Sequence, residues 1–143
     1  MIGVRECAGD RDLALSTEIY NRVWPRAAIS VEETAAWRAG HDETLEVLGE
    51  LDGEVIGYAK FSLTDAQPKT AYHDLTGVKR AWRGPGVAGA LKRAEISWAK
   101  ENGYEKAATM NEERNAPIRK LNERYGYRPA SGRIFVRGPL APA

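Results

Sequence analysis

The fold is decided by residues 76–91, which read TGVKRAWRGPGVAGAL. An extended segment from Ala71 runs into a glycine-rich turn, and this turn opens into a long amphipathic helix. The first N–H groups of a helix have no acceptor inside the helix, and the helix dipole places partial positive charge on them, so a phosphate can dock there. Gly84 and Gly86 lack a Cβ atom, which allows positive φ angles and the close approach of a ligand. This order of elements predicts an anion site, with the positive charge of Arg83 at its rim.

The glycine turn has two possible ligands. Residues 84–89 match the dinucleotide fingerprint G-x-G-x-x-G, which requires a βαβ unit and an acidic residue about twenty positions further on. The next strand, expected at 104–110, carries Glu105 at its start and an uncharged end, and too little chain follows for the rest of a Rossmann sheet. Dinucleotide binding is therefore the weaker interpretation.

The same turn also resembles a motif of a known protein family. Residues 83–88, RGPGVA, follow Val78 and resemble the acyl-CoA-binding motif R-x-x-G-x-G/A of the GNAT superfamily of N-acetyltransferases. A second stretch, NAPIRKLNERYGY at 115–127, is similar to the closing motif of that family, N-x-x-(apolar)-x-x-L-(Y/N)-x-x-x-G-(F/Y). Two motifs in the right order are far more specific than one, and together they cover residues 76–129.

The rest of the chain follows an α+β order. Strands are expected at 2–7, 44–51, 54–63, 71–78, 104–110 and 133–137, and helices at 11–23, from 30 to about 38 or 39, at 86–102 and from 115 to 126. Asp52 and Gly53, between the second and third strands, form the strongest hairpin signal in the sequence. The resemblance implies the same order of elements. We therefore expect a mixed, mostly antiparallel central sheet with helices on both faces, the acyl-CoA N-acyltransferase (GNAT) fold.

Local signals mark the ends and faces of the helices. Asp10 can cap the first helix, and Ser30 with Glu33 forms a capping box that opens the second. Lys92 and Arg93 are expected to be solvated charges. The expected core face of the long helix consists of apolar residues at helical spacing, namely Val87, Leu91, Ala94 and Trp98.

Composition limits the class of protein. The chain has 143 residues, of which 43% are hydrophobic and 29% charged, and this size and balance favour a single soluble globular domain over residues 1–143. The formal net charge of +1 gives no sign of a nucleic-acid-binding face. The lone Cys7 cannot form an internal disulfide, and no cluster with metal-ligand spacing accompanies it, so no metal is expected. The sequence shows neither a signal peptide nor a membrane span, which favours the cytoplasm.

The resemblance implies that acetyl-CoA is the cosubstrate and where it binds. Its pantetheine would bond to the backbone of the fourth strand, and its pyrophosphate would lie on the amides of the glycine turn. Gly77 is expected to mark a bulge that turns the strand toward the thioester. The residues assigned to the cofactor in this way are Thr76, Gly77, Val78, Arg83, Gly84, Gly86, Val87, Ala88, Asn115 and Asn122.

The implied reaction is direct attack of a primary amine on the thioester, for which a base must remove the ammonium proton. Asp74 and His73 are the candidates, and on a regular strand they point to opposite faces. Asp74 would share a face with Thr76 and Val78, and it is narrowly preferred. A main-chain N–H would stabilise the charge that grows on the carbonyl oxygen.

Two departures from the family pattern bear on the reaction. Many relatives carry tyrosine at the position of Asn122, where it protonates the departing thiolate, and an asparagine side chain cannot act as an acid. Water or another tyrosine, such as Tyr72, would have to serve instead. Pro85 has no N–H where relatives usually offer one to the phosphates.

Three hypotheses follow. The leading one is an acetyl-CoA-dependent N-acetyltransferase that acts on a small-molecule or peptide amine, without nucleic-acid or membrane partners. The oligomeric state is open, and a homodimer is frequent in the family. Acidic residues such as Glu112 and Glu113 could attract a cationic amine, or they are solvated loop charges. The second hypothesis is a non-catalytic acyl-CoA-binding sensor with the same fold, and the third is a dinucleotide-binding fragment.

Overall fold

The computed structural model describes residues 2–40, 44–63, 69–84, 86–109 and 115–129. The chain divides into two units, residues 1–110 and 111–143, and each is described by itself. The expected last strand at 133–137 lies outside the described residues, as do Pro85, Glu112 and Glu113.

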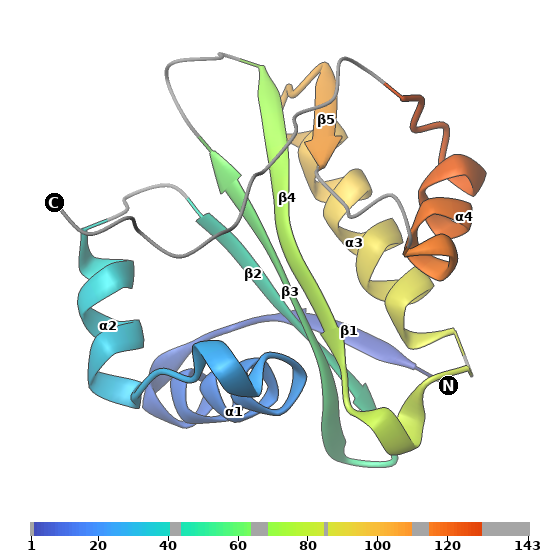
Figure 1. Ribbon diagram of the computed structural model, residues 1–143. Helices are drawn as coiled ribbons and strands as arrows, with labels where there is room; N and C mark the ends of the chain where they lie inside the picture. Colours follow the sequence, from blue (N-terminus) through green and yellow to red (C-terminus); the bar gives the residue numbers. More distant parts are fainter. Residues whose placement is uncertain (1, 41–43, 64–68, 85, 110–114, 130–143) are drawn as a thin grey trace, which may run out of the picture. The chain divides into compact units, whose positions relative to one another are not determined.

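A five-stranded sheet forms the centre of the first unit (Figure 1). Its strands lie side by side in chain order, and the first four are antiparallel, whereas the last pair is parallel. The mostly antiparallel mixed sheet is therefore confirmed. The strands are β1 (Gly3–Glu6), β2 (Thr44–Leu51), β3 (Glu54–Leu63), β4 (Thr70–Val78) and β5 (Lys106–Thr109).

The hairpin between β2 and β3 has the predicted turn. Asp52 has a φ of 51° and Gly53 a φ of 79°. Two successive positive φ angles define the type I′ turn, whose twist matches that of the flanking strands. The turn pairs Leu51 with Glu54, and a bulge at Ile56 then shifts the register of the two strands. Glu46 lies opposite Lys60 and Leu48 opposite Tyr58 as a result.

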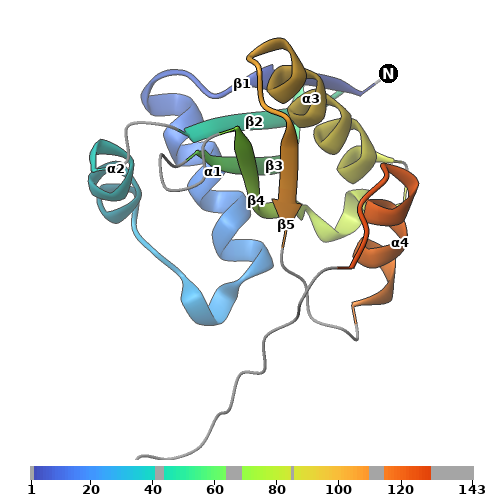
Figure 2. The same cartoon turned by 90° about the horizontal axis from the view of Figure 1, so that it is seen from above.

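Helices cover both faces of this sheet, as expected. On one face lie α1 (Gly9–Val23) and α2 (Val31–Ala39), joined by the short 3₁₀ turn η1 (Pro25–Ala27). On the other face lies α3 (Val87–Glu101), which follows a second 3₁₀ turn, η2 (Arg80–Trp82). Figure 2 shows α1 and α3 on opposite sides of the strands. Each face has its own apolar cluster. Ile19 of α1 belongs to one cluster, and Leu91 of α3 belongs to the other.

Glycine allows α3 to lie close to the sheet. A Cβ atom built on Gly57 would lie 2.9 Å from Val87 Cγ1 and 3.0 Å from Leu91 Cδ1, which is too close for any other residue without movement of the helix. Gly49 in the neighbouring strand meets the same two side chains at 3.3 and 3.4 Å. The first turn of α3 is thus packed directly on the backbone of β2 and β3.

Of the two predicted N-terminal caps, the one of α2 is confirmed and the one of α1 is wrong. The Ser30 capping box is present, since Glu33 N donates to Ser30 Oγ at 3.0 Å and Ser30 N donates to Glu33 Oε2 at 2.8 Å. The expectation that Asp10 caps α1 is wrong, because the helix begins at Gly9. Asp12, inside the helix, caps it instead by accepting a hydrogen bond of 2.8 Å from the N–H of Ala8.

The buried face of α3 is wider than predicted. Val87 and Leu91 are buried as expected, but Lys92 is only 1% exposed and Glu95 is fully buried. The assignment of Lys92 as a solvated charge is therefore wrong. Close packing on the sheet covers a broad arc of the helix, so residues beside the apolar stripe are buried with it.

The second unit contains α4 (Ala116–Arg124). Asn115 is its N-cap residue, although the Asn115 side chain accepts no hydrogen bond from the backbone of the first turn. The helix ends before Gly126, whose φ is 86°. Both ends lie close to where the sequence places them.

Candidate active site

The edge of β4 becomes open halfway along the strand. Its ladder with β5 pairs residues 70–73 with residues 106–109 and ends where His73 lies opposite Thr109. On its other side β4 stays paired with β3 as far as Val78, which lies opposite Gly57. Among the described residues, positions 75–78 therefore have a strand partner on one side only (Figure 1). An extended ligand can add to such an edge as a further strand.

A β-bulge lies at the point where the two strands part. Lys60 is opposite Leu75 and Phe61 is opposite His73, so Asp74 is the extra residue in β4. The prediction that Gly77 marks the bulge is wrong, because Gly77 pairs with Tyr58 in regular register. Gly77 has a packing role instead: a Cβ atom there would lie 3.1 Å from Val23 Cγ2 on α1.

The bulge changes which residues share a face. Asp74 accepts a hydrogen bond from Ser62 and therefore faces α1 and α2. Val78 packs in the cluster beneath α3, and Thr76 lies opposite Ala59 of that cluster. The expectation that Asp74 shares a face with Thr76 and Val78 is therefore wrong, because a bulge interrupts the alternation of side chains.

The start of α3 has the geometry of an anion site. Gly86 is the N-cap residue with a φ of 92°, and Gly84 has a φ of 108°. Among the described residues, and apart from the chain neighbours of each glycine, no heavy atom lies within 4 Å of a Cβ atom built on either one. The first hydrogen bond of the helix runs from Ala90 N to Gly86 O at 3.0 Å, and the first turn contains no acidic residue. The amides of Val87 and Ala88 precede that bond, so by helix geometry they have no acceptor in the helix.

Arg83 ties this turn to the end of β4. Its Nε donates to the carbonyl oxygen of Val78 at 3.1 Å. The turn also contains Lys79, whose Nζ lies 3.4 Å from Glu54 and 3.7 Å from Glu18. The structure thus brings together residues 76–78, 83–84 and 86–88, which the sequence assigned to the cofactor. Asn115 and Asn122, assigned with them, lie in the second unit, Asn122 within α4.

His73 and Asp74 lie on opposite faces, as predicted. His73 is buried beneath α3, with its ring centroid 3.9 Å from that of Phe61 and its Nδ1 3.2 Å from Glu95 Oε1. Burial lowers the pKa of His73 to about 2, helped by the charge of Lys92, and burial raises the pKa of Glu95 to about 8. At neutral pH the contact therefore joins an uncharged imidazole and a protonated carboxyl.

Replacing His73 with asparagine keeps a polar atom near the position of Nδ1. This variant is expected to make the free energy of unfolding depend less steeply on pH below pH 6.5. The pKa of His73 is about 2 in the folded chain against 6.5 in the unfolded chain. Between these values the unfolded state binds more protons, so the free energy of unfolding falls as the pH drops below 6.5, by up to about 1.4 kcal/mol per pH unit. Denaturant unfolding of both proteins from about pH 6 to about pH 4 measures the two slopes.

Glu95 does not obscure this comparison. Because the pKa of Glu95 is raised from 4.5 to about 8, its contribution to stability increases as the pH falls through that window. That contribution is present in both proteins and cancels in the difference between the slopes. Equal slopes for the two proteins would contradict the uncharged, buried state of His73.

The other face of the sheet carries a row of polar side chains beneath α2. Lys60 Nζ lies 3.7 Å from Asp74 Oδ2 and 3.6 Å from the ring centroid of Trp37. Next to Lys60, Glu46 binds two partners: Arg38 Nε lies 2.5 Å from its Oε2, and the hydroxyl of Tyr58 donates to its Oε1. These residues come from β2, β3, β4 and α2. Charges of opposite sign thus alternate along the row.

A pocket of about 510 Å³ opens at the end of this row. Cys7, Arg38, Thr44 and Glu46 are among the residues that line it. Burial raises the pKa of the Cys7 thiol to about 12, with a further contribution from Glu46, so this cysteine is not a reactive thiolate. The pocket is polar and lies on the face to which Asp74 points.

Sequence reasoning missed Trp37, Glu46 and Lys60. The hairpin turn alone would place Glu46 opposite Ala59, and it is the bulge at Ile56 that places Lys60 opposite Glu46. The contact with Trp37 depends on how α2 docks, and no pattern in the sequence encodes that.

Within the described ranges, no group of three or more histidine, cysteine, aspartate or glutamate residues could hold a metal ion. No helix in the same part of the chain is long and apolar enough to cross a membrane.

Comparisons with known proteins bear on this geometry. The sequence profile of the Acetyltransferase (GNAT) family matches residues 13–127. A relative in sequence is an aminoglycoside N(6')-acetyltransferase type 1 of Stenotrophomonas maltophilia, with 23% identity over 139 residues that cover 92% of this chain and 90% of the relative.

Solved structures share the fold. The aminoglycoside acetyltransferase AAC(6')-Iy, in complex with a bisubstrate analogue of CoA and acetylneamine, has a TM-score of 0.79 at 19% identity and covers 98% of this chain and 99% of its own. An N-acetyltransferase from Staphylococcus aureus has a TM-score of 0.78 at 25% identity and covers 92% of this chain and 86% of its own.

Proposed function

The chain belongs to the acetyltransferase (GNAT) family and is an acetyl-CoA-dependent N-acetyltransferase, and we propose that its acceptor is a primary amine of a small molecule. The observation that carries the proposal is the junction of the open β4 edge with the glycine turn of α3. Bound acetyl-CoA supplies an electrophilic thioester, and the residues of the chain have to bind it, orient the amine and move a proton.

We assign the binding of the cosubstrate to two backbone segments. The edge at residues 76–78 would take the pantetheine, and the amides of Gly84, Gly86, Val87 and Ala88 would take the pyrophosphate. The open space around both glycines and the lack of acidic residues in the first turn support this assignment. The bond from Arg83 to Val78 supports it further, because it brings a positive charge to the junction of the two segments.

We assign the role of general base to Asp74. It is exposed beside the opening between β4 and β5, on the face that carries the polar row. His73 is a poor candidate, since it is buried on the opposite face and burial holds its pKa at about 2. Tyr72 lies opposite Ser62 and so shares the face of Asp74, which supports it as the group that protonates the departing thiolate in place of the tyrosine missing at Asn122.

The acceptor is expected to be cationic, because Asp74 and Glu46 both face the polar row. Aminoglycosides are the first acceptors to test, since two of the three proteins named above are aminoglycoside acetyltransferases. The single-domain organisation of residues 1–143, the cytoplasmic location and the homodimer stay predictions.

Thermal unfolding tests cofactor binding. Acetyl-CoA at about 100 times its Kd is expected to stabilise the chain by about 2.7 kcal/mol, because a ligand that binds only the folded state raises apparent stability. NAD at the same concentration is the control and should leave the melting temperature unchanged. Stabilisation by NAD alone would favour the dinucleotide hypothesis and overturn the proposal.

Thiol release with a panel of amines tests the reaction itself. Release that depends on both acetyl-CoA and an amine is expected. If acetyl-CoA stabilises the chain but no amine in a broad panel releases thiol, the proposed reaction is wrong and the acyl-CoA sensor is favoured.

A further inference from the structure

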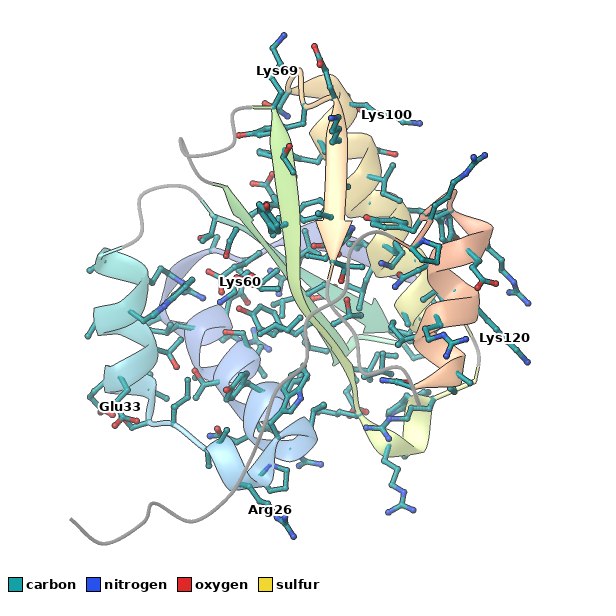
Figure 3. The ribbon with its side chains drawn as sticks, turned by 45° about the horizontal axis from the view of Figure 1, so that its top comes forward. Arg26, Glu33, Lys60, Lys69, Lys100 and Lys120 are labelled. Atoms are coloured by element: carbon teal, nitrogen blue, oxygen red, sulfur yellow. The ribbon has the colours of Figure 1, made fainter. Side chains whose placement is uncertain are left out.

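Lys60 occupies an unusual position for a lysine. Its side chain is 12% exposed and lies on the face of the sheet that α2 covers (Figure 3). The Nζ atom contacts both the ring of Trp37 and the carboxylate of Asp74. Lys69 and Lys100, by contrast, are exposed and project away from the sheet. Lys60 is therefore a primary amine held inside the polar row.

The amine of Lys60 lies next to the proposed base, where the nitrogen of an acceptor is expected. A general base must come within hydrogen-bond reach, or reach through one water, of the nitrogen that it deprotonates. Lys60 Nζ already lies 3.7 Å from Asp74 Oδ2. Asp74 is also the bulged residue next to the end of the β4–β5 ladder, where the acyl group is expected. A lysine side chain has four rotatable bonds and can follow a small shift toward that opening.

The surroundings of Lys60 make its uncharged amine easier to form than that of a lysine in water. Burial lowers the pKa of Lys60, and the charge of Arg38 on α2 acts in the same direction. Asp74 on β4 and Glu46 on β2 oppose this shift, but the net direction is downward. Only an uncharged amine carries the lone pair needed to attack a carbonyl carbon.

We propose that Lys60 is an internal acceptor and that the chain acetylates it with its own bound acetyl-CoA. The inference rests on the proposed function. Lys60 Nζ attacks the carbonyl carbon of the thioester, a C–N bond forms and the C–S bond breaks. One proton of the amine passes to Asp74, and coenzyme A leaves as a thiolate that takes a proton from Tyr72, the group assigned to this role above. The products are an amide at Lys60 and free coenzyme A.

This acetylation would change the acceptor side of the site. An acetylated lysine is uncharged, so the ion pair with Asp74 and the cation over Trp37 are both lost. Asp74 and the Trp37 ring then become available to the ammonium group of an external amine. Acetylation of Lys60 would thus prepare the site for a cationic acceptor.

Mass spectrometry of the intact chain and of its peptides tests this. The purified chain, incubated with acetyl-CoA and no acceptor, is expected to gain one acetyl group at Lys60 faster than at Lys100 by on the order of a hundredfold, the usual contribution of a positioned base. Lys60→Arg keeps the positive charge but offers no comparable nucleophile, so the acetyl group should be lost from this position. Asp74→Asn should slow labelling of Lys60 toward the rate at Lys100.

The outcomes separate this inference from the proposed function. Thermal stabilisation by acetyl-CoA without labelling of Lys60 overturns the internal acceptor and leaves the proposed function intact. Labelling in proportion to exposure, with Lys69 and Lys100 ahead of Lys60, also overturns it, because it indicates chemical acetylation in solution. If acetyl-CoA neither stabilises nor labels the chain, the proposed function fails first and the inference fails with it.

Discussion

The variant Asp74→Asn is expected to lower kcat for amine acetylation by on the order of a hundredfold or more, because a positioned base contributes about 10²- to 10⁴-fold. Asparagine keeps the size of aspartate and can still accept the hydrogen bond from Ser62, but it cannot take a proton from the acceptor. The KM for acetyl-CoA should stay close to the original value, since the cosubstrate is assigned to backbone groups elsewhere. Thiol release at saturating acetyl-CoA and amine measures the effect.

Asp52→Asn is the matched control for this prediction. Asp52 is exposed in the β2–β3 turn with a φ of 51°, a conformation that asparagine also tolerates. The activity of the Asp52→Asn variant should equal that of the original chain. Full activity of Asp74→Asn combined with a large loss in His73→Asn would show that the base had been assigned to the wrong residue.

The variant Gly86→Glu is expected to abolish stabilisation by acetyl-CoA, with a loss of affinity on the order of a hundredfold or more if each phosphate contact contributes about 1.5–3 kcal/mol. The new carboxylate would stand at the start of α3 and repel the pyrophosphate, and its side chain would fill the open space beside the turn. Isothermal calorimetry with acetyl-CoA measures the affinity. An unchanged Kd would show that the diphosphate of acetyl-CoA does not bind at this turn.

Gly103→Glu separates loss of binding from backbone strain. Gly103 lies at the other end of α3, and its φ of 82° is close to the 92° of Gly86. It is also exposed, with no heavy atom within 4 Å of a built Cβ atom. Both variants pay a similar conformational penalty of about 1–2 kcal/mol, but only Gly86→Glu should lose the response to acetyl-CoA.

Local signals in the sequence predicted much of the fold. The β2–β3 turn follows from Asp52 and Gly53, and the capping box follows from Ser30 and Glu33, because each depends on the chemistry of neighbouring residues. The glycine turn before α3 could be found for the same reason. These features need no knowledge of which segments pack together.

Features that depend on packing could not be predicted. The bulge at Asp74 results from the pairing of β4 with β3, and it moved Asp74 to the face opposite Thr76. Burial of Lys92 and Glu95 results from the close approach of α3 to the sheet, which Gly49 and Gly57 permit. In both cases a segment distant in the sequence decides where a side chain points.

Helix α2 contains no buried residue. It meets the rest of the first unit through polar contacts such as Thr17 with Thr34 and Arg38 with Glu46, and through the ring of Trp37 over Lys60. Contacts of this kind contribute about 1 kcal/mol or less each when they are partly exposed. Substitutions in α2 are therefore expected to change the acceptor side of the molecule at little cost in stability, without altering the segments that we assign to coenzyme A.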